Sequence, residues 1–539
     1  MLERLARERF DVLVVGGGVT GVGVALDAAS RGLSAALVEA DDFASGTSSR
    51  SSKLVHGGLR YLQQGDVRLV YEALRERQRL RRNAPHLVSL LPFMIPILTK
   101  DGLIPRRVAR ALGSAMWMYD VTGGFRIGRL HKRLKADAAF SHLPTMSRER
   151  LAGAYLYYDA TTDDARLVLT IARTAAARGA ALANRCRVVA FVKDASGLVT
   201  GATVEADGRR IDVSAKVVVN AAGVWADELR TLEDGHEADS IRPAKGIHIT
   251  VPWEKVRNDI AVVIPVRGDK RSLFVVPWGE RPDGTFEHTY VGTTDTDYIG
   301  PLEDPPCTAD DIAYVLRALN QVITTGITTE DVTGVWAGLR PLVKSATSGR
   351  TADLSRRHRV TTGSAGVIAI TGGKLTTYRE MAQDTVDAVL RRLDLKARGR
   401  TARLKLLGAD GFEAPTNSAT EAHLATRYGT LASNVTALID ADPPLGEPLV
   451  PGLNYLQAEA VYAARNEMVG TLEDVLVRRT RAHLFNRSAT LQAAPAIAAL
   501  LADELGWDDA ETSRQVAAYR DLVDREEKDA LTGSSSVSA

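Results

Sequence analysis

Residues 11–40, DVLVVGGGVTGVGVALDAASRGLSAALVEA, decide the fold of this chain. A short apolar strand leads into the motif G-x-G-x-x-G at Gly16, Gly18 and Gly21, and a helical pattern and a second strand follow. Gly16 permits a tight turn, Gly18 lets the backbone approach a pyrophosphate, and Gly21 lets the helix pack closely on the sheet. Glu39 lies 18 residues after Gly21, where a carboxylate accepts hydrogen bonds from an adenosine ribose. The segment predicts an α/β, Rossmann-like domain that binds a dinucleotide.

Two later segments repeat the pattern of a buried strand that ends at glycine, KVVVNAAGVWAD at 216–227 and GVIAITGGKLTTYREMA at 366–382. Residues 40–62 are rich in small and hydroxyl side chains, which can run alongside an extended cofactor. Three such junctions suit one long cofactor across a single sheet, which favours FAD over NAD. Besides the three glycines and Glu39, the candidate cofactor-binding residues are Thr47, Ser48, Ser52, Lys53, Leu54, Gly57, Gly58, Ala222, Gly223, Gly372, Gly373, Leu375 and Thr376.

Composition excludes several other classes of protein. The 539 residues carry a net charge of only +2, so nothing in the bulk charge indicates nucleic-acid binding. The two cysteines, Cys186 and Cys307, lie far apart, which excludes a disulfide scaffold and a cysteine-ligated metal, and neither lies in a cofactor motif. We therefore expect non-covalent FAD and no metal. The charged N-terminal residues predict no secretory signal, and no apolar run is long enough to span a bilayer, so we expect a cytoplasmic protein that is soluble or lies on a membrane surface.

The glycine junctions predict a discontinuous FAD-binding domain made of residues 1–95, 150–240 and 346–390. Residues 241–345 alternate apolar and polar side chains, which predicts an antiparallel substrate-cap sheet over the flavin, together with residues 96–149. Residues 391–539 have helical spacing and predict a C-terminal all-α domain.

The chain resembles the aerobic, quinone-linked FAD-dependent glycerol-3-phosphate dehydrogenases, within the D-amino-acid-oxidase-like flavoprotein group. TSSRSSKLVHGGLRYL (47–62) and GGKLTTYR (372–379) carry the resemblance most specifically. YYDATTDDARLVL, NAAGVWAD, KGIHI, VGTTDT and WAGLRPL add to it, and the block 455–485 is similar to the family's helical cap. The resemblance implies oxidation of sn-glycerol 3-phosphate to dihydroxyacetone phosphate, by hydride transfer from C2 to FAD N5, with electrons passed to a quinone. It also implies a homodimer and, as partner, a membrane surface, which is the cytoplasmic face of the inner membrane.

Such a substrate needs cations for its phosphate and a group that takes a proton. By resemblance, Arg340 and Lys374 have catalytic roles, and Arg60, Tyr61 and Arg356 bind substrate. His248 is our candidate proton acceptor because its ordinary pKa, near 6.5, suits proton transfer at neutral pH. Lys374 or a water is the alternative acceptor, and His248 is otherwise a strand histidine held by one backbone hydrogen bond. Asp163 and Asp164 are expected to cap the helix that follows them.

Residues 104–119, IPRRVARALGSAMWMY, predict a basic amphipathic helix with Ile104, Val108, Leu112 and Met116 on one face. That face either docks on an anionic membrane surface, where a quinone takes the electrons, or packs in the protein core. Two other functions remain open: a glycerol-3-phosphate oxidase that uses O₂, and a flavin-binding protein without catalysis. The cluster of cations favours a phosphate substrate over the amine substrates of related oxidases.

Overall fold

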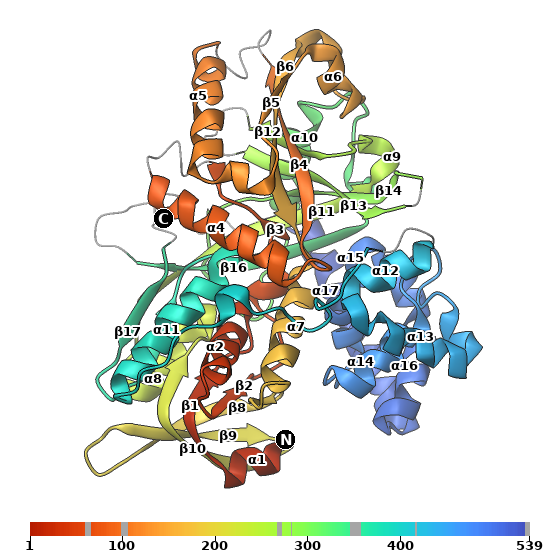
Figure 1. Ribbon diagram of the computed structural model, residues 1–539. Helices are drawn as coiled ribbons and strands as arrows, with labels where there is room; N and C mark the ends of the chain where they lie inside the picture. The colour runs from red at the N-terminus through yellow and green to blue at the C-terminus, as the bar shows by residue number, and fades with distance from the viewer. Residues whose placement is uncertain are drawn as a thin grey trace.

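The computed structural model describes residues 1–59, 66–98, 106–266, 272–281, 283–344, 357–414 and 418–533. They form two β-sheets with flanking helices and a separate group of C-terminal helices, drawn in blue in Figure 1.

The first sheet is built around the predicted strand–glycine–helix unit. Its order is β17-β18-β10-β1-β2-β7, and the four pairs from β18 to β7 are parallel. The strands are β1 (Arg9–Val15), β2 (Ala35–Val38), β7 (Ala181–Ala183), β10 (Arg209–Asn220), β17 (Arg359–Thr362) and β18 (Ile368–Thr371), with β8 (Arg187–Lys193) and β9 (Val199–Ala206) beside β10. Because parallel strands end at the same edge, the glycine breaks after β1, β10 and β18 lie together, which is the arrangement that FAD binding requires.

Helices cover one face of this sheet. The helices α2 (Val19–Ser30), α7 (Asp164–Ala176) and α11 (Tyr378–Arg392) bury Val12 and Val14, whereas Leu13 and Val15 pack on the other face. Burial on both faces explains why this strand reads as a continuous apolar run. Asp163 is the N-cap of α7, where its carboxylate accepts a hydrogen bond from the Arg166 amide, so its predicted capping role is confirmed.

The second sheet is largely antiparallel, as the alternation over 241–345 predicts. Its order is β15-β11-β14-β13-β12-β4-β6-β3, with β16 beside β11 and β5 beside β6. The strands are β3 (Leu54–Val55), β4 (Ser89–Leu98), β5 (Lys132–Leu134), β6 (Leu151–Thr161), β11 (Ile241–Pro252), β12 (Ala261–Pro265), β13 (Ser272–Glu280), β14 (Phe286–Gly292), β15 (Thr296–Asp297) and β16 (Gly334–Val343).

The boundary between the two sheets differs from the predicted one. β4 and β6 fall mainly in the segments 1–95 and 150–240, yet they pair with each other and β4 joins β12 of the second sheet. The short strand β3 also pairs with β6. These pairings join residues far apart in the chain, so local patterns in the sequence cannot assign them to a sheet.

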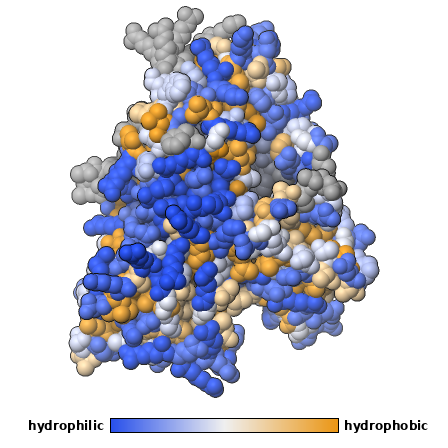
Figure 2. All heavy atoms as spheres, viewed as in Figure 1, coloured by the Kyte–Doolittle hydropathy of each residue, from blue (hydrophilic) through white to orange (hydrophobic). Residues whose placement is uncertain are grey.

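The C-terminal region is all-α, as predicted. Its elements are α12 (Ala419–Tyr428), α13 (Ala432–Ala441), α14 (Gln457–Asn466), the π-helical turn η11 (Asp474–Arg479), α15 (Ala482–Phe485), α16 (Arg487–Leu505) and α17 (Asp509–Leu531). The other principal helices are α1 (Leu2–Arg7), α4 (Val67–Asn83), α5 (Arg106–Thr122), α6 (Ala136–Ser141), α8 (Ala226–Asp234), α9 (Trp253–Val256) and α10 (Ala309–Asn320). Figure 2 shows hydrophilic residues gathered over α4, which is rich in arginine.

The described part of the predicted apolar stripe of α5, Leu112 and Met116, is inside the protein, whereas Ile104 lies outside the described residues. Leu112 and Met116 are buried in a cluster with Leu74 and Tyr157. Among the side chains described in α5, from Leu112 onward, the large exposed apolar ones are Trp117, Met118 and Val121. Within the described ranges, no helix combines the length and the apolar character that crossing a bilayer requires.

Candidate functional site

The glycine turn after β1 is packed against the second strand-to-glycine junction. Gly16 has φ +114°, and a Cβ there would lie 2.6 Å from the Ala221 carbonyl oxygen. A Cβ on Gly21 would overlap the Gly16 carbonyl. Ser48 accepts a hydrogen bond from the amide of Val19, 2.9 Å away, and so joins the turn to the small-residue segment. These contacts leave room for backbone alone, as a turn that cradles a pyrophosphate requires.

Glu39 closes one end of this turn. Its carboxylate accepts hydrogen bonds from the amides of Gly17, at 2.5 Å, and Asp41, at 2.9 Å. Burial raises the pKa of Glu39 to about 7, and the two amide hydrogen bonds oppose this rise. The predicted ribose acceptor therefore stands at the end of β2, beside the glycine turn.

A cavity of about 400 Å³ runs along the three junctions. The predicted residues that line it are Gly16, Gly18, Glu39, Thr47, Ser48, Ala222, Gly223, Gly372, Gly373, Lys374 and Leu375. The glycine-lined walls, the helix N-terminus and the carboxylate at one end are the features that an FAD needs, so the residues present fit this cofactor.

The other predicted cofactor residues lie around the cavity rather than on its wall. Thr376 hydrogen-bonds the backbone of His56 through its hydroxyl and so joins the segment 47–58 to the third junction. Gly57 donates its amide hydrogen to Asp159 and Tyr119. Gly21, Ser52, Leu54 and Gly58 are likewise not among the wall residues. Their predicted contacts with FAD stay predictions.

The side chain of Lys53, a predicted cofactor-binding residue, is surrounded by other groups of the protein. Its ammonium lies 3.1 Å from the Asp164 carboxylate and donates to the Ser49 carbonyl at 3.2 Å. The same ammonium stands over the ring of Trp336. Burial lowers the pKa of Lys53 to about 8, although Asp164 opposes this effect. Since the side chain is engaged there, any contact with the cofactor is left to the Lys53 backbone.

The small-residue segment lies against the second sheet. Thr47 donates a hydrogen bond to the Leu339 carbonyl, and Trp336 and Tyr290 donate to the carbonyls of Ser51 and Ser52. These contacts place the cofactor segment directly beneath β11, β14 and β16, as the predicted sheet over the flavin requires.

Strand register places the two central candidates on the same face of this sheet. His248 of β11 pairs with Trp336 of β16, and Arg340 lies four residues further along β16. Paired residues and residues at even spacing point to one face of a sheet, and the intervening Ile247, Ile249 and Ala337 are buried on the other. His248, Trp336 and Arg340 therefore share the face that meets the cofactor segment.

His248 is more enclosed than a half-buried strand histidine. Its side chain is buried, its ring stacks on Trp336 at 4.7 Å, and its Nε2 lies 2.9 Å from the Ser52 hydroxyl. Its Nδ1 has no hydrogen-bonding partner in the described part of the chain. Burial first, then the charges of Lys53 and Arg340, hold the pKa of His248 well below its usual value. The imidazole is therefore uncharged, and the same causes disfavour its protonated form and weaken it as a base.

Arg340 and Lys374 supply positive charge near this face. The guanidinium of Arg340 donates to the Thr293 hydroxyl at 3.0 Å and to the Thr294 carbonyl at 3.1 Å, and it lies 3.3 Å from Asp295. Lys374 follows the Gly372–Gly373 break and lines the cavity, as does Pro341 next to Arg340. The predicted substrate residues Arg60, Tyr61 and Arg356 lie outside the described residues.

The sequence interpretation missed part of the cavity wall. Arg187 and Val188 of β8 and Trp225 line it, as do Glu473, Arg478, Leu522 and Arg525 of the C-terminal helices. The signal for the second group is the run RRTR at 478–481, three arginines inside a block of otherwise apolar helical spacing.

Comparison with known proteins shows the family to which this chain belongs. The chain matches the family model described as FAD dependent oxidoreductase over residues 11–379, and that described as C-terminal domain of alpha-glycerophosphate oxidase over 399–512. It is 41% identical to glycerol-3-phosphate dehydrogenase 2 of Mycobacterium tuberculosis, over 97% of this chain and 90% of the relative. It is 37% identical to the mitochondrial glycerol-3-phosphate dehydrogenase of Homo sapiens, over 95% and 73%. The structure of the Bacillus halodurans glycerol-3-phosphate dehydrogenase complexed with FAD matches with TM-score 0.77 and 31% identity, over 98% of this chain and 97% of that one. The chain therefore belongs to the family of FAD-dependent glycerol-3-phosphate dehydrogenases.

Proposed function

We propose that this protein oxidises sn-glycerol 3-phosphate to dihydroxyacetone phosphate and passes the electrons to a quinone. The observation that carries the proposal is the shared sheet face of His248 and Arg340, directly over the cofactor segment. One face thus offers an uncharged base and a phosphate-binding cation. The names of the relatives, glycerol-3-phosphate dehydrogenase in each case, support the same substrate.

The chemistry divides between the cofactor and the chain. FAD, when bound, accepts the hydride that leaves C2 of the substrate. Arg340 and Lys374 bind the phosphate, because a guanidinium grips a phosphate with two parallel hydrogen bonds and an ammonium adds a compact charge. Arg60, Tyr61 and Arg356 complete this pocket in our proposal.

His248 takes the proton of the C2 hydroxyl. Its Nδ1 is buried and has no partner in the described part of the chain, so we assign the incoming proton to Nδ1 and the hydrogen that is donated to the Ser52 hydroxyl to Nε2. The Trp336 ring, stacked on the imidazole, fixes its orientation and excludes water from one side. As the O–H proton moves to Nδ1 and the C2 hydride departs, the remaining electron pair closes the C=O bond and no further reactant is needed.

The identity of the electron acceptor, a quinone rather than O₂, is the most specific part of the proposal. An oxidase that uses O₂ is the alternative, and the likeness to the L-alpha-glycerophosphate oxidase of Mycoplasma pneumoniae, at 18% identity, concerns the fold alone. A non-catalytic flavin-binding protein is the other alternative, and the buried His248 and the cation Arg340 argue against it.

The acceptor is tested by steady-state oxidation of sn-glycerol 3-phosphate in air, with and without a short-chain quinone. We expect turnover to depend on the quinone and to release little hydrogen peroxide. Stoichiometric peroxide without quinone would make the protein an oxidase, and no turnover under either condition would favour the non-catalytic reading.

A membrane surface is the natural place to meet a quinone, and α5 offers an apolar edge for it. Trp117, Met118 and Val121 are exposed, with Val121 at 74%. The Trp117 ring contacts His131. Lys132 and Arg133, which follow His131 in the chain, are exposed. Apolar side chains beside cations are the pattern that binds an anionic lipid surface. We propose that this edge of α5, not its buried stripe, contacts the membrane.

The double substitution Trp117→Glu and Val121→Glu is expected to lower the partition of the protein onto anionic vesicles by about tenfold. It removes apolar area that would be buried in the lipid, and the anionic vesicle surface repels the new carboxylates. Co-sedimentation with vesicles of mixed neutral and anionic lipid measures this. Ile299→Glu, which changes a side chain that is 87% exposed elsewhere, is the control and should leave partition unchanged. Equal partition of all three proteins would contradict the proposal.

A further inference from the structure

The C-terminal helical domain contributes directly to the cofactor cavity. The turn η11 and the residue before it supply Arg478 and Glu473 to the wall, and α17 supplies Leu522 and Arg525. A π-helical turn is rare and is frequently found at functional sites. The domain is therefore more than a cap on the outside of the fold.

Arg478 and Arg479 of this turn form hydrogen bonds with the segment that follows Glu39. Arg478 donates through Nε to Asp42 at 2.8 Å, and Arg479 donates through both terminal nitrogens to the same carboxylate, at 2.6 and 2.9 Å. Asp42 is fully buried, and so are the two arginines. Asn184 is a further donor to Asp42, at 3.1 Å. Asp42 stands three residues after Glu39, in the connection between β2 and the cavity-lining residues Thr47 and Ser48.

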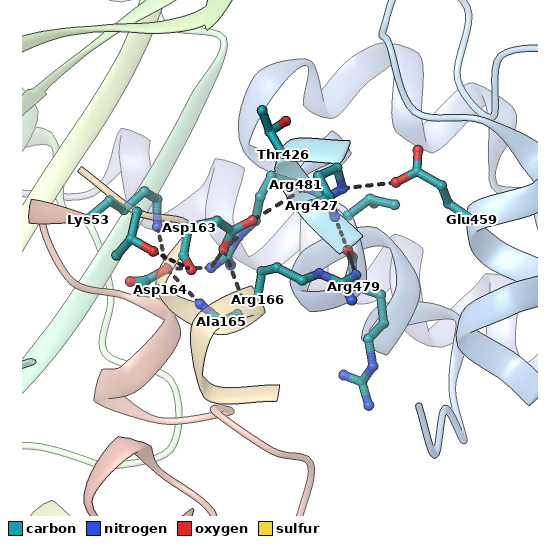
Figure 3. A network of polar contacts seen from close by, with 12 residues as sticks. Lys53, Asp163, Asp164, Ala165, Arg166, Thr426, Arg427, Glu459, Arg479 and Arg481 are labelled. Carbon is teal, nitrogen blue, oxygen red and sulfur yellow. Dashed lines mark hydrogen bonds and ion pairs between the residues drawn. The ribbon is translucent and has the colours of Figure 1, made fainter. Parts of the chain in front are cut away.

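A second group of ion pairs holds the same interface away from the cavity. Figure 3 shows Arg481 of the C-terminal domain directed at Asp163 and Asp164. The pair of Arg427 with Glu459 in the same view lies within the C-terminal domain. Asp163 belongs to the N-terminus of α7 and is not among the residues that line the cavity. The interface thus has one ionic contact on Asp42, in the segment that follows Glu39, and another at the N-terminus of α7, where Asp163 accepts from Arg481.

We propose that Arg478 and Arg479 are positioning residues for FAD: by holding Asp42, they fix the segment from Glu39 to Ser48 in the conformation that binds the dinucleotide, so that cofactor binding and docking of η11 are coupled.

The physical reason is the cost of a buried charge without its partner. Separating the buried Asp42 carboxylate from the two guanidiniums would leave a buried charge without a partner, so the segment has one favourable position. A segment held in place loses less conformational entropy when the cofactor binds. Because coupling is reciprocal, bound FAD must also stabilise the docked position of η11 by the same factor.

The test compares two identical substitutions in the full-length holoenzyme, Asp42→Asn and Asp163→Asn. Each neutralises a carboxylate of the first domain that pairs with C-terminal arginines, and asparagine still caps α7 at position 163. Dissociation of FAD is followed by the rise in free flavin fluorescence, and the melting temperature is recorded for each variant. We expect both variants to melt earlier, with Asp42→Asn raising the FAD dissociation constant about tenfold and Asp163→Asn changing it less than about twofold.

Equal losses of affinity in the two variants would mean that the interface acts only through general stability. Unchanged affinity in Asp42→Asn would mean that the segment keeps its position without the arginines. Either result overturns the proposal.

A second measurement needs no substitution and decides the case if Asp42→Asn fails to fold. Amide hydrogen exchange of residues 474–479 is compared in the wild-type holoenzyme and after removal of FAD. We expect FAD to slow exchange in η11 by about tenfold, because of the reciprocal coupling. Identical exchange in the two states would overturn the proposal, whatever the variants do.

Discussion

Replacing Arg340 by methionine is expected to lower kcat/KM for sn-glycerol 3-phosphate by about 10²–10³-fold. Arg340 shares the sheet face of His248, and its guanidinium is held by Thr293, Thr294 and Asp295. If Arg340 holds the phosphate as proposed, its loss also loses the position of C2 relative to the flavin, so kcat falls together with affinity.

The loss must be specific for the phosphate. Arg340→Lys should recover part of the activity, since it restores charge without the planar fork. Arg242→Met removes another arginine of the same sheet, one paired with Asp297, and should leave kcat/KM nearly unchanged. Steady-state kinetics with sn-glycerol 3-phosphate and with glycerol, on variants of equal flavin content, measure the effect. An equal loss for glycerol would show that Arg340 supports the pocket rather than the phosphate.

Gly21→Ala is expected to abolish stable FAD binding, with flavin content below about a tenth of the wild-type value. The new Cβ would overlap the Gly16 carbonyl, so the turn and α2 must separate where the pyrophosphate binds. The flavin absorbance of the purified protein, relative to its absorbance at 280 nm, measures the content.

Gly197→Ala is the control for loss of a glycine. Gly197 has φ +83° and open space around a Cβ, so this substitution strains the backbone on the surface without touching the turn. It should lower stability slightly and retain full flavin. Full flavin in Gly21→Ala would mean that α2 can move without opening the cofactor site.

The parts of the fold that the sequence predicts well depend on local patterns. The strand β1, the turn at Gly16 and the helix α2 follow one another in the chain, and each has its own signal, so residues 11–40 suffice. The two later glycine junctions carry the same signal, which is why their convergence on one sheet edge could be expected before the pairing of β1, β10 and β18 was known.

Long-range pairing and the surroundings of a side chain could not be predicted in this way. The helical spacing of Leu112 and Met116 correctly indicates an apolar stripe, but a period does not tell whether protein or lipid covers it. Lys53 lies in a cofactor motif, yet its ammonium is engaged by Asp164, more than a hundred residues away. The contact of Arg479 with Asp42 joins residues even further apart in the chain. The sequence therefore shows the run of arginines but does not show which carboxylate they contact.

Anaerobic reduction of the bound flavin tests the central claim most directly. The yellow holoenzyme is mixed without oxygen with sn-glycerol 3-phosphate, and separately with glycerol, lactate and D-alanine, while the flavin absorbance is followed. We predict rapid bleaching by sn-glycerol 3-phosphate alone, because in the proposed function Arg340 and Lys374 bind a phosphate and His248 takes the proton of the neighbouring alcohol. A flavin that stays oxidised with sn-glycerol 3-phosphate, or that bleaches equally with the compounds lacking a phosphate, would contradict the proposed function.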